Sequence, residues 1–117
     1  MKFIGKDDDL FELIKDGVIR ILDSEITRIN IFEESVLIFE VDLTFKANLV
    51  RLRFKGIKEY SFYYNSTHIF YNVECYTLIK NDNLFYISFD PEDERSAIIL
   101  ENDNDFILCE SIEVYSI

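Results

Sequence analysis

The sequence predicts a mainly β fold, either an antiparallel β-sandwich or a partly open barrel, with one short N-terminal helix. Apolar and polar residues alternate along several segments, which is typical of strands with one buried face. The breaks between these segments are rich in Asn, Asp and Ser, which favour turns. Only three Gly and one Pro occur in 117 residues, so long irregular linkers are not expected. The length predicts a single domain over residues 1–117.

The helix is expected over residues 7–16. Aspartates at its start suit an N-cap and the positive end of the helix dipole. Leu10, Leu13 and Ile14 fall on one face, and Gly17 is a natural stop. Residues 18–32 then read as two short strands or one bent strand.

The clearest strand pair is residues 36–46 and 49–55, whose apolar positions alternate with charged ones. A turn at Ala47-Asn48 predicts the pairs Lys46–Leu49, Leu43–Leu52, Val41–Phe54, Asp42–Arg53 and Glu40–Lys55. A shift by two residues would keep every side chain on the same face.

Later segments predict further strands, separated by turn-forming residues. These strands are expected at residues 59–64, 68–79, 84–89, 96–100 and 106–115. The hairpin carries the basic stripe Arg51, Arg53 and Lys55, which could contact nucleic acid. Pairing with the neighbouring Glu40 and Asp42 is the favoured use of these cations.

The chain predicts a cytoplasmic protein with no membrane contact. Its first residues, MKFIGKDDDL, lack the apolar run of a secretory signal, and no segment approaches the ~18 apolar residues of a membrane span. Cys75 and Cys109 are expected to be small buried hydrophobic residues, although sequence alone leaves a disulfide open.

Negative charge is concentrated in the second half of the sequence. The net charge is −11; residues 1–58 hold 11 acidic and 10 basic residues, whereas residues 59–117 hold 12 acidic residues against Lys80 and Arg95. Such a surface repels nucleic acid, whose binding depends on Lys and Arg, and attracts a basic protein partner. The alternative is that the acidity only maintains solubility.

No catalytic constellation is found, so we expect no enzyme, no cofactor and no metal. His68 is the only histidine, and its neighbours supply no nucleophile or orienting carboxylate. Asp103 and Asp105 resemble the start of a calcium loop, but Leu108 and Val114 stand where an EF-hand needs Gly and Glu. A weak cation site there stays open, and no phosphate-binding glycine motif occurs.

The residues predicted to bind the partner are acids around two turns and two aromatic side chains of the segment 68–79. Exposed tyrosines among acids are common in protein interfaces, although a second layer could instead cover these rings. The predicted residues are Asp90, Glu92, Asp93, Glu94, Glu101, Asp103, Asp105, Phe70 and Tyr76.

Three short segments carry a resemblance: residues 21–26 (ILDSEI), 52–57 (LRFKGI) and 86–91 (YISFDP). Together they resemble small acidic bacterial β-proteins that include immunity-like proteins of polymorphic toxin systems, over most of residues 18–117. The resemblance implies a cytosolic protein that neutralises a cognate toxin by binding it. The negative charge of the second half favours a basic partner, such as a toxin nuclease. Alternatives are a nucleic-acid mimic that blocks a defence nuclease, a small-ligand-binding β-barrel, and an enzyme built on carboxylates. The sequence makes no prediction of oligomeric state.

Overall fold

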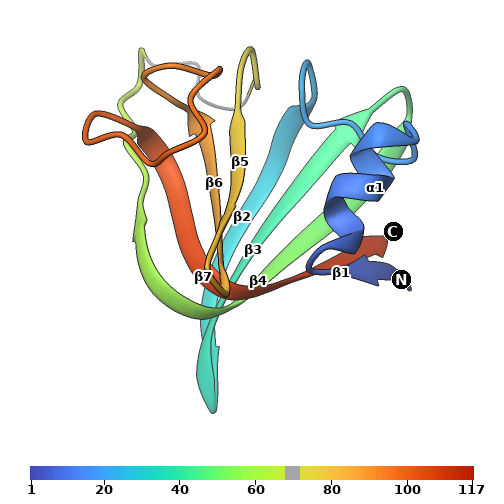
Figure 1. The fold of residues 1–117 in the computed structure, drawn as a ribbon. Helices are drawn as coiled ribbons and strands as arrows, with labels where there is room; N and C mark the ends of the chain where they lie inside the picture. Colours follow the sequence, from blue (N-terminus) through green and yellow to red (C-terminus); the bar gives the residue numbers. More distant parts are fainter. Residues whose placement is uncertain (68–71) are drawn as a thin grey trace.

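The computed structural model describes residues 1–67 and 72–117, which form seven strands and one helix (Figure 1). The elements are β1 (Lys2–Lys6), α1 (Asp9–Lys15), β2 (Glu25–Glu34), β3 (Val36–Phe45), β4 (Asn48–Ser61), β5 (Thr77–Asn81), β6 (Leu84–Asp90) and β7 (Asn104–Ser116). The mainly β class with one short N-terminal helix is therefore confirmed.

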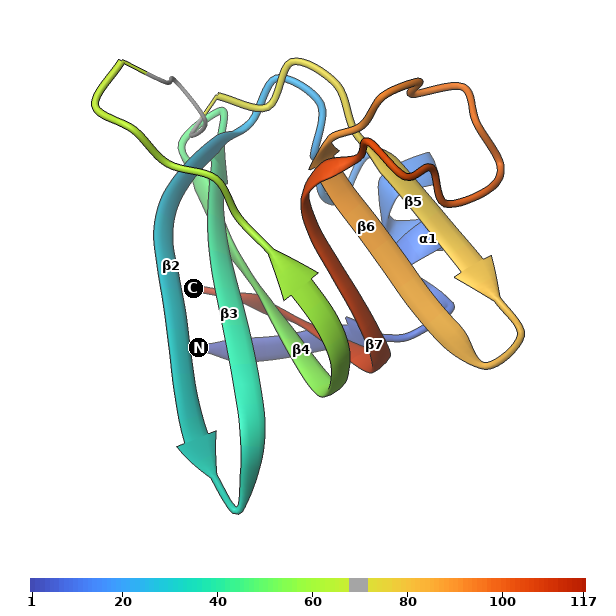
Figure 2. The ribbon, with the colours of Figure 1, turned by 90° about the vertical axis from the view of Figure 1, so that its left-hand side faces the viewer.

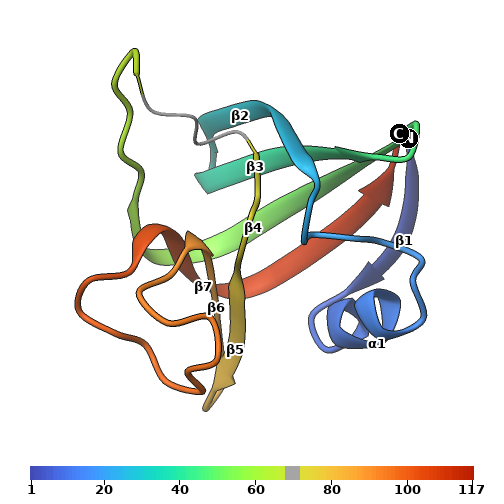
Figure 3. The same ribbon diagram turned by 90° about the horizontal axis from the view of Figure 1, so that it is seen from above.

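The strands form one open antiparallel sheet in the order β2-β3-β4-β7-β6-β5, visible side by side in Figure 2; β1 pairs with β7 outside this path. Near one end of the sheet, the segment before β5 approaches the segment before β2 (Figure 3). There Asp23 N donates to Val73 O at 2.7 Å and Val73 N donates to Ser24 O at 2.9 Å. The arrangement is thus a single curved sheet whose two sides are linked at one end, and not two separate packed sheets.

Helix α1 is shorter than expected and begins at Asp9. Lys6 N donates to the Asp9 carboxylate at 3.1 Å, which fixes the chain just before the helix. Gly17, with a φ of 73°, follows the end of the helix, as expected from its tolerance of positive φ. Leu10 is fully buried, so α1 contributes directly to the core.

The hairpin of β3 and β4 has the predicted faces but a register two residues away from the expected one. Its turn is Lys46-Ala47 and not Ala47-Asn48, because both residues adopt positive φ (46° and 65°), as in a type I′ turn. The observed pairs are Phe45–Asn48, Leu43–Val50, Asp42–Arg51, Val41–Leu52 and Glu40–Arg53.

Several other strand predictions are wrong. No strand covers residues 18–24, residues 59–61 continue β4, and only the end of the segment 72–79 belongs to a strand. The predicted residues 68–71 lie outside the described residues. Residues 96–100 form part of the β6–β7 loop. Leu100 is partly buried and lines a cavity with Tyr86 and Phe106, whereas Ile98 and Ile99 are exposed.

Strand β4 is paired with β7 along most of its length and bends sharply within this pairing (Figure 2). Gly56 has a φ of 65° and lies between the pairs Lys55–Ser111 and Ile57–Cys109. A Cβ at this position would stand 2.7 Å from the Cβ of Glu110, closer than side chains normally approach. A glycine is therefore required at this bend, both for its backbone conformation and for space.

The hydrophobic core fills the inner face of the curved sheet and extends to α1. Strands β3, β4 and β6 contribute alternate residues, as the hydrophobic alternation predicted, whereas β1 and β5 add only the partly buried Ile4 and Leu78. Members of this cluster include Leu10, Ile26, Phe39, Val41, Leu43, Leu52, Phe54, Phe85, Ile87, Ile107 and Val114. Because apolar side chains fill the inner face, the polar and charged side chains that could bind a partner lie on the outer face and in the loops.

Candidate binding surface

The loop between β6 and β7, residues 91–103, carries most of the predicted partner-binding acids. It is held against the sheet by Asp103, which is only 7% exposed. The Asp103 carboxylate accepts hydrogen bonds from Tyr86 Oη at 2.7 Å, Glu92 N at 2.8 Å and Leu100 N at 3.1 Å. Asp103 was predicted to contact a partner, but its burial assigns it to the folding of the loop.

Asp105 is also internal, with 3% exposure. Its carboxylate accepts a hydrogen bond from Tyr63 N at 2.9 Å and so fixes the segment that follows β4. Asp90 is half-buried, and its side chain receives a long hydrogen bond of 3.5 Å from Asn104. Buried carboxylates need such partners, because desolvation without hydrogen bonds is costly. Asp103 and Asp105 therefore do not belong to an exposed binding surface.

The remaining predicted acids lie on the surface of the loop. Glu92, Glu94 and Glu101 are exposed. Asp93 is also exposed, but it forms an ion pair with Arg95, whose Nε lies 3.4 Å from the Asp93 carboxylate. Backbone hydrogen bonding from Arg95 is the largest influence on Asp93 and lowers the pKa of its carboxyl. The loop therefore presents three glutamates without such an internal cation.

Cys75 and its neighbour Glu74 lie in the segment that precedes β5. Burial raises the pKa of the Cys75 thiol, and the negative charges of Glu94, Asp90 and Glu74 raise it further. Cys75 and Cys109 are both free thiols, so the disulfide alternative is wrong. Glu74 was missed by sequence reasoning because it lies 18 residues before Glu92 and shows no motif of its own.

Tyr76 is half-buried and stands between two surface cavities. A cavity of about 330 Å³ lies between α1 and the loop, with Tyr76 and Glu94 in its walls. A second cavity, of about 310 Å³, lies between Tyr76, Phe45 and Lys46. Burial raises the pKa of Tyr76. The other predicted aromatic residue, Phe70, lies outside the described residues, as does His68.

The two cations of the second half of the sequence are already paired. Lys80 Nζ lies 2.9 Å from Asp8 of the N-terminal segment, and Arg95 pairs with Asp93. Within the described part of the chain, five glutamates near the loop have no ion-pair partner: Glu59, Glu74, Glu92, Glu94 and Glu101. We call these five residues the acidic surface.

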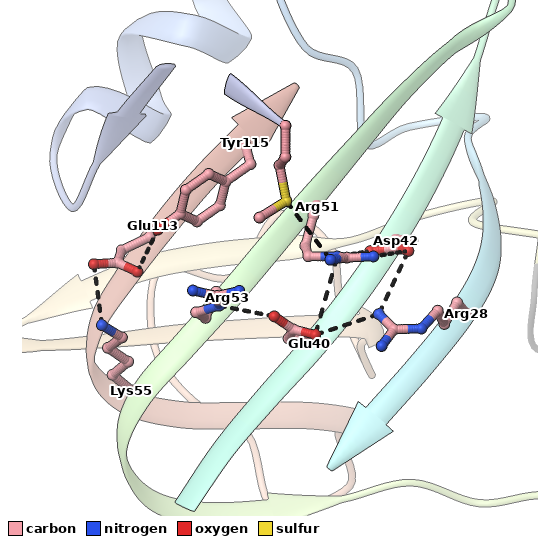
Figure 4. A network of polar contacts seen from close by, with 9 residues as sticks. Arg28, Glu40, Asp42, Arg51, Arg53, Lys55, Glu113 and Tyr115 are labelled. Carbon is pink, nitrogen blue, oxygen red and sulfur yellow. Dashed lines mark hydrogen bonds and ion pairs between the residues drawn. The ribbon is translucent and has the colours of Figure 1, made fainter. Parts of the chain in front are cut away.

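The basic stripe of the hairpin is neutralised on the outer face of the sheet (Figure 4). Arg51 binds Asp42 through two hydrogen bonds, of 2.8 and 3.0 Å, and Arg53 Nε donates to Glu40 at 2.7 Å. Glu40 and Asp42 are only 2% and 4% exposed. The favoured local pairing of Arg51 and Arg53 is thus confirmed, and these cations are not available as a separate patch.

Arg28 of β2 completes this network, with Nη1 3.3 Å from Glu40 and 3.6 Å from Asp42. Burial by itself would raise the pKa of Glu40, but the hydrogen bonds and charges of Arg53, Arg28 and Arg51 outweigh it and hold the pKa below its usual value. Sequence reasoning missed Arg28, because the pairing of β2 with β3 was not predicted.

At its other end the network reaches β7. The guanidinium of Arg53 lies 5.0 Å from the centre of the Tyr115 ring, a cation–π contact, and Lys55 Nζ lies 3.3 Å from Glu113. Lys55 was expected to pair with Glu40, but the observed register places Arg53 opposite Glu40. Lys55 instead uses Glu113 of β7, the strand on the other side of β4. The outer face of β2, β3, β4 and β7 is therefore nearly balanced in charge, in contrast to the acidic surface.

Comparison with protein-family models, curated protein sequences and solved structures gives no match. In the described part of the chain, no helix has the length and apolar character to cross a membrane. Within residues 1–67 and 72–117, no group of three or more Asp, Glu, His or Cys side chains is arranged to hold a metal ion.

Proposed function

We propose that this protein is an acidic binding protein of the inhibitor or immunity type, which acts by binding a basic protein. The observation that carries the proposal is the acidic surface: Glu59, Glu74, Glu92, Glu94 and Glu101 lack cationic partners within the described residues, whereas the nearby cations are already paired. Unpaired charges of one sign attract a partner of the opposite sign and accelerate its association.

The arrangement beside the acidic surface supports recognition of a protein. Tyr76 and Glu94 line the same cavity, so an aromatic ring and a carboxylate are presented together. Interfaces often combine an aromatic anchor with polar groups at its rim. A toxin that cleaves nucleic acid is a suitable partner, because an active site for phosphates is basic. An inhibitor of this kind needs no catalytic residue.

The test is affinity capture from the lysate of the native host with the tagged protein, at low and at moderate salt. The variant Glu74→Gln/Glu92→Gln/Glu94→Gln/Glu101→Gln removes four charges from the acidic surface. We expect the native protein to capture a basic protein in a salt-sensitive manner, and we expect the variant to lose it. The captured protein is then purified, and its activity is measured with and without the native protein.

The matched control is Glu12→Gln/Glu25→Gln/Glu33→Gln/Glu34→Gln, which removes four exposed acids from α1 and β2. It has the same net charge as the first variant and should retain the partner. Equal loss in both variants would mean that only overall charge matters, and the acidic surface would then have no special role.

Small-ligand binding is a second candidate, favoured by the two cavities that meet at Tyr76. Each is near the lower end of the roughly 300–1,000 Å³ that ligand sites occupy. Under this alternative, a small amphipathic molecule would raise the melting temperature of the native protein but not of a Tyr76→Ala variant. No stabilisation across a chemically broad set of such molecules would exclude it.

A further inference from the structure

A third cavity lies on the outer face of the sheet, between strands β4, β6 and β7 and the β6–β7 loop. It has a volume of about 220 Å³. Tyr86, Phe106 and Leu108 form its walls on the strands, and Leu100 closes it from the loop. The rings of Tyr86 and Phe106 are 5.6 Å apart and inclined by 32°. Tyr86 is only 1% exposed and packs behind Phe106, which is partly exposed and offers the aromatic surface of the cavity.

The cavity is smaller than the roughly 300–1,000 Å³ of ordinary small-molecule sites. Its walls are fixed, because the loop is tied to the sheet by the three hydrogen bonds of Asp103. The size therefore suits one inserted side chain and not a whole metabolite or a cofactor.

Two carboxylates of the acidic surface, Glu59 and Glu101, also line this cavity. Neither has an ion-pair partner in residues 1–67 or 72–117. Burial is the main cause of the raised pKa of Tyr86; the hydrogen bond to Asp103 and the charges of Asp103 and Glu59 raise it further. An apolar, aromatic cavity with negative charge at its edge favours an organic cation.

We propose that this cavity binds the side chain of one arginine, supplied by the basic partner. The inference deepens the proposed function and rests on it. A guanidinium is planar and weakly hydrated, so it stacks on an aromatic ring such as that of Phe106, which is partly exposed in this cavity. Its five N–H donors reach two carboxylates at once, whereas the compact ammonium of lysine is a single point charge. The hydrogen bonds of Asp103 to Tyr86 and to Leu100, which hold the loop in place, thus also position two of the residues that line this subsite.

The direct test uses small probes and the full chain. N-acetyl-arginine amide is titrated into the native protein, and chemical-shift changes are followed by NMR at the backbone amides of Leu100, Phe106 and Leu108. We expect saturable changes at these positions, with weaker binding of N-acetyl-lysine amide. The neutral isostere N-acetyl-citrulline amide should bind at least tenfold more weakly than the arginine probe. Equal binding of arginine and citrulline, or changes spread over the surface away from the cavity, would overturn the inference.

Variants test the two carboxylates. Glu59→Gln and Glu101→Gln should each weaken the arginine probe by about tenfold, since each removes a charged hydrogen-bond acceptor. The control Glu33→Gln/Glu34→Gln, on β2, removes as many charges as the double variant Glu59→Gln/Glu101→Gln and should leave the affinity unchanged. Affinity that falls equally in this control would overturn the subsite, because it would reflect total charge only.

The proposed function and this subsite can fail separately. A partner captured equally well by the native protein and by Glu59→Gln/Glu101→Gln would reject the arginine subsite and leave the binding function intact. An arginine probe that saturates the cavity, in a protein that captures no basic partner at either salt concentration, would reject the proposed partner and leave the subsite supported.

Discussion

Individual buried carboxylates of this protein illustrate how an acidic chain still folds compactly. Asp103 has three hydrogen-bond donors around it, and Glu40 and Asp42 share three arginines. Burying a charge is costly unless it is paired or hydrogen-bonded, and each of these groups satisfies that condition. Composition alone could not separate them from the exposed glutamates, because burial depends on contacts with distant parts of the chain.

The role of Asp103 can be tested by Asp103→Ala. The substitution leaves the Tyr86 hydroxyl and two backbone N–H groups without their acceptor, so we expect a loss of about 3 kcal/mol in the free energy of unfolding. Tyr86→Phe removes one of the three hydrogen bonds and should cost about 1 kcal/mol. Urea denaturation measures both variants. A cost for Asp103→Ala no larger than that for Tyr86→Phe would show that the backbone contacts to the loop add nothing.

Glu40 predicts a pH dependence of stability. Its pKa in the folded protein is lowered from an ordinary value of 4.5, so its contribution is fully present above that value. The contribution is lost as the pH falls from about 4.5 through the lower pKa of the folded state, because the folded protein must then take up a proton against its arginines. Urea denaturation of the native protein between pH 7 and pH 3 should show a steeper loss of stability than that of Glu40→Gln. Parallel profiles would mean that the network does not depend on this charge.

At the scale of elements, alternation predicted the faces of β3 and β4 correctly, and it located β6 and β7 to within two residues. It could not fix the register, because a shift by two residues leaves each face unchanged. The positive φ angles of Lys46 and Ala47 determine the position of the turn, and neither lysine nor alanine is a residue type that favours positive φ. A strand was also wrongly predicted at residues 96–100, where the apolar Ile98 and Ile99 lie exposed in the β6–β7 loop.

The bend of β4 gives a prediction with an internal control. Gly56→Ala places a Cβ 2.7 Å from that of Glu110 in a backbone of positive φ, and should cost about 3 kcal/mol. Gly17 has a similar φ of 73°, but a Cβ added there would have no heavy atom of the described chain within 4 Å beyond its chain neighbours. Gly17→Ala should therefore lower the free energy of unfolding by only about 1 kcal/mol. Thermal and urea denaturation compare the two. Similar costs would show that steric crowding at the bend is relieved by movement of Glu110.

Across the whole molecule, charge is sorted in space as well as in sequence. Balanced networks occupy the outer face of β2, β3, β4 and β7, and the acidic surface gathers around the β6–β7 loop. The charge asymmetry of the second half indicated this region in advance. It could not identify Glu59 and Glu74, because only the folded chain brings the end of β4 and the segment before β5 beside that loop.

This distribution predicts that salt stabilises the protein. Raising the NaCl concentration from 0.01 M to 0.15 M shortens the screening length from ~30 Å to ~8 Å, which weakens repulsion within a chain of net charge −11. We expect the melting temperature to rise over this range, and to rise less in the variant that lacks four charges of the acidic surface. A melting temperature that falls as salt is added would indicate that screening of the attraction within the outer-face network outweighs screening of the repulsion.

The central position of β7 has a consequence for how the chain acquires its structure. β7 is the last of these strands to be synthesised, yet it joins β4 to β6 and also receives β1. Until it emerges, the hairpins β2–β3–β4 and β5–β6 have no strand between them, and the two halves of the sheet cannot unite. Folding is therefore expected to be slow and to occur only after translation of β7, with apolar strand edges exposed to chaperones during the delay.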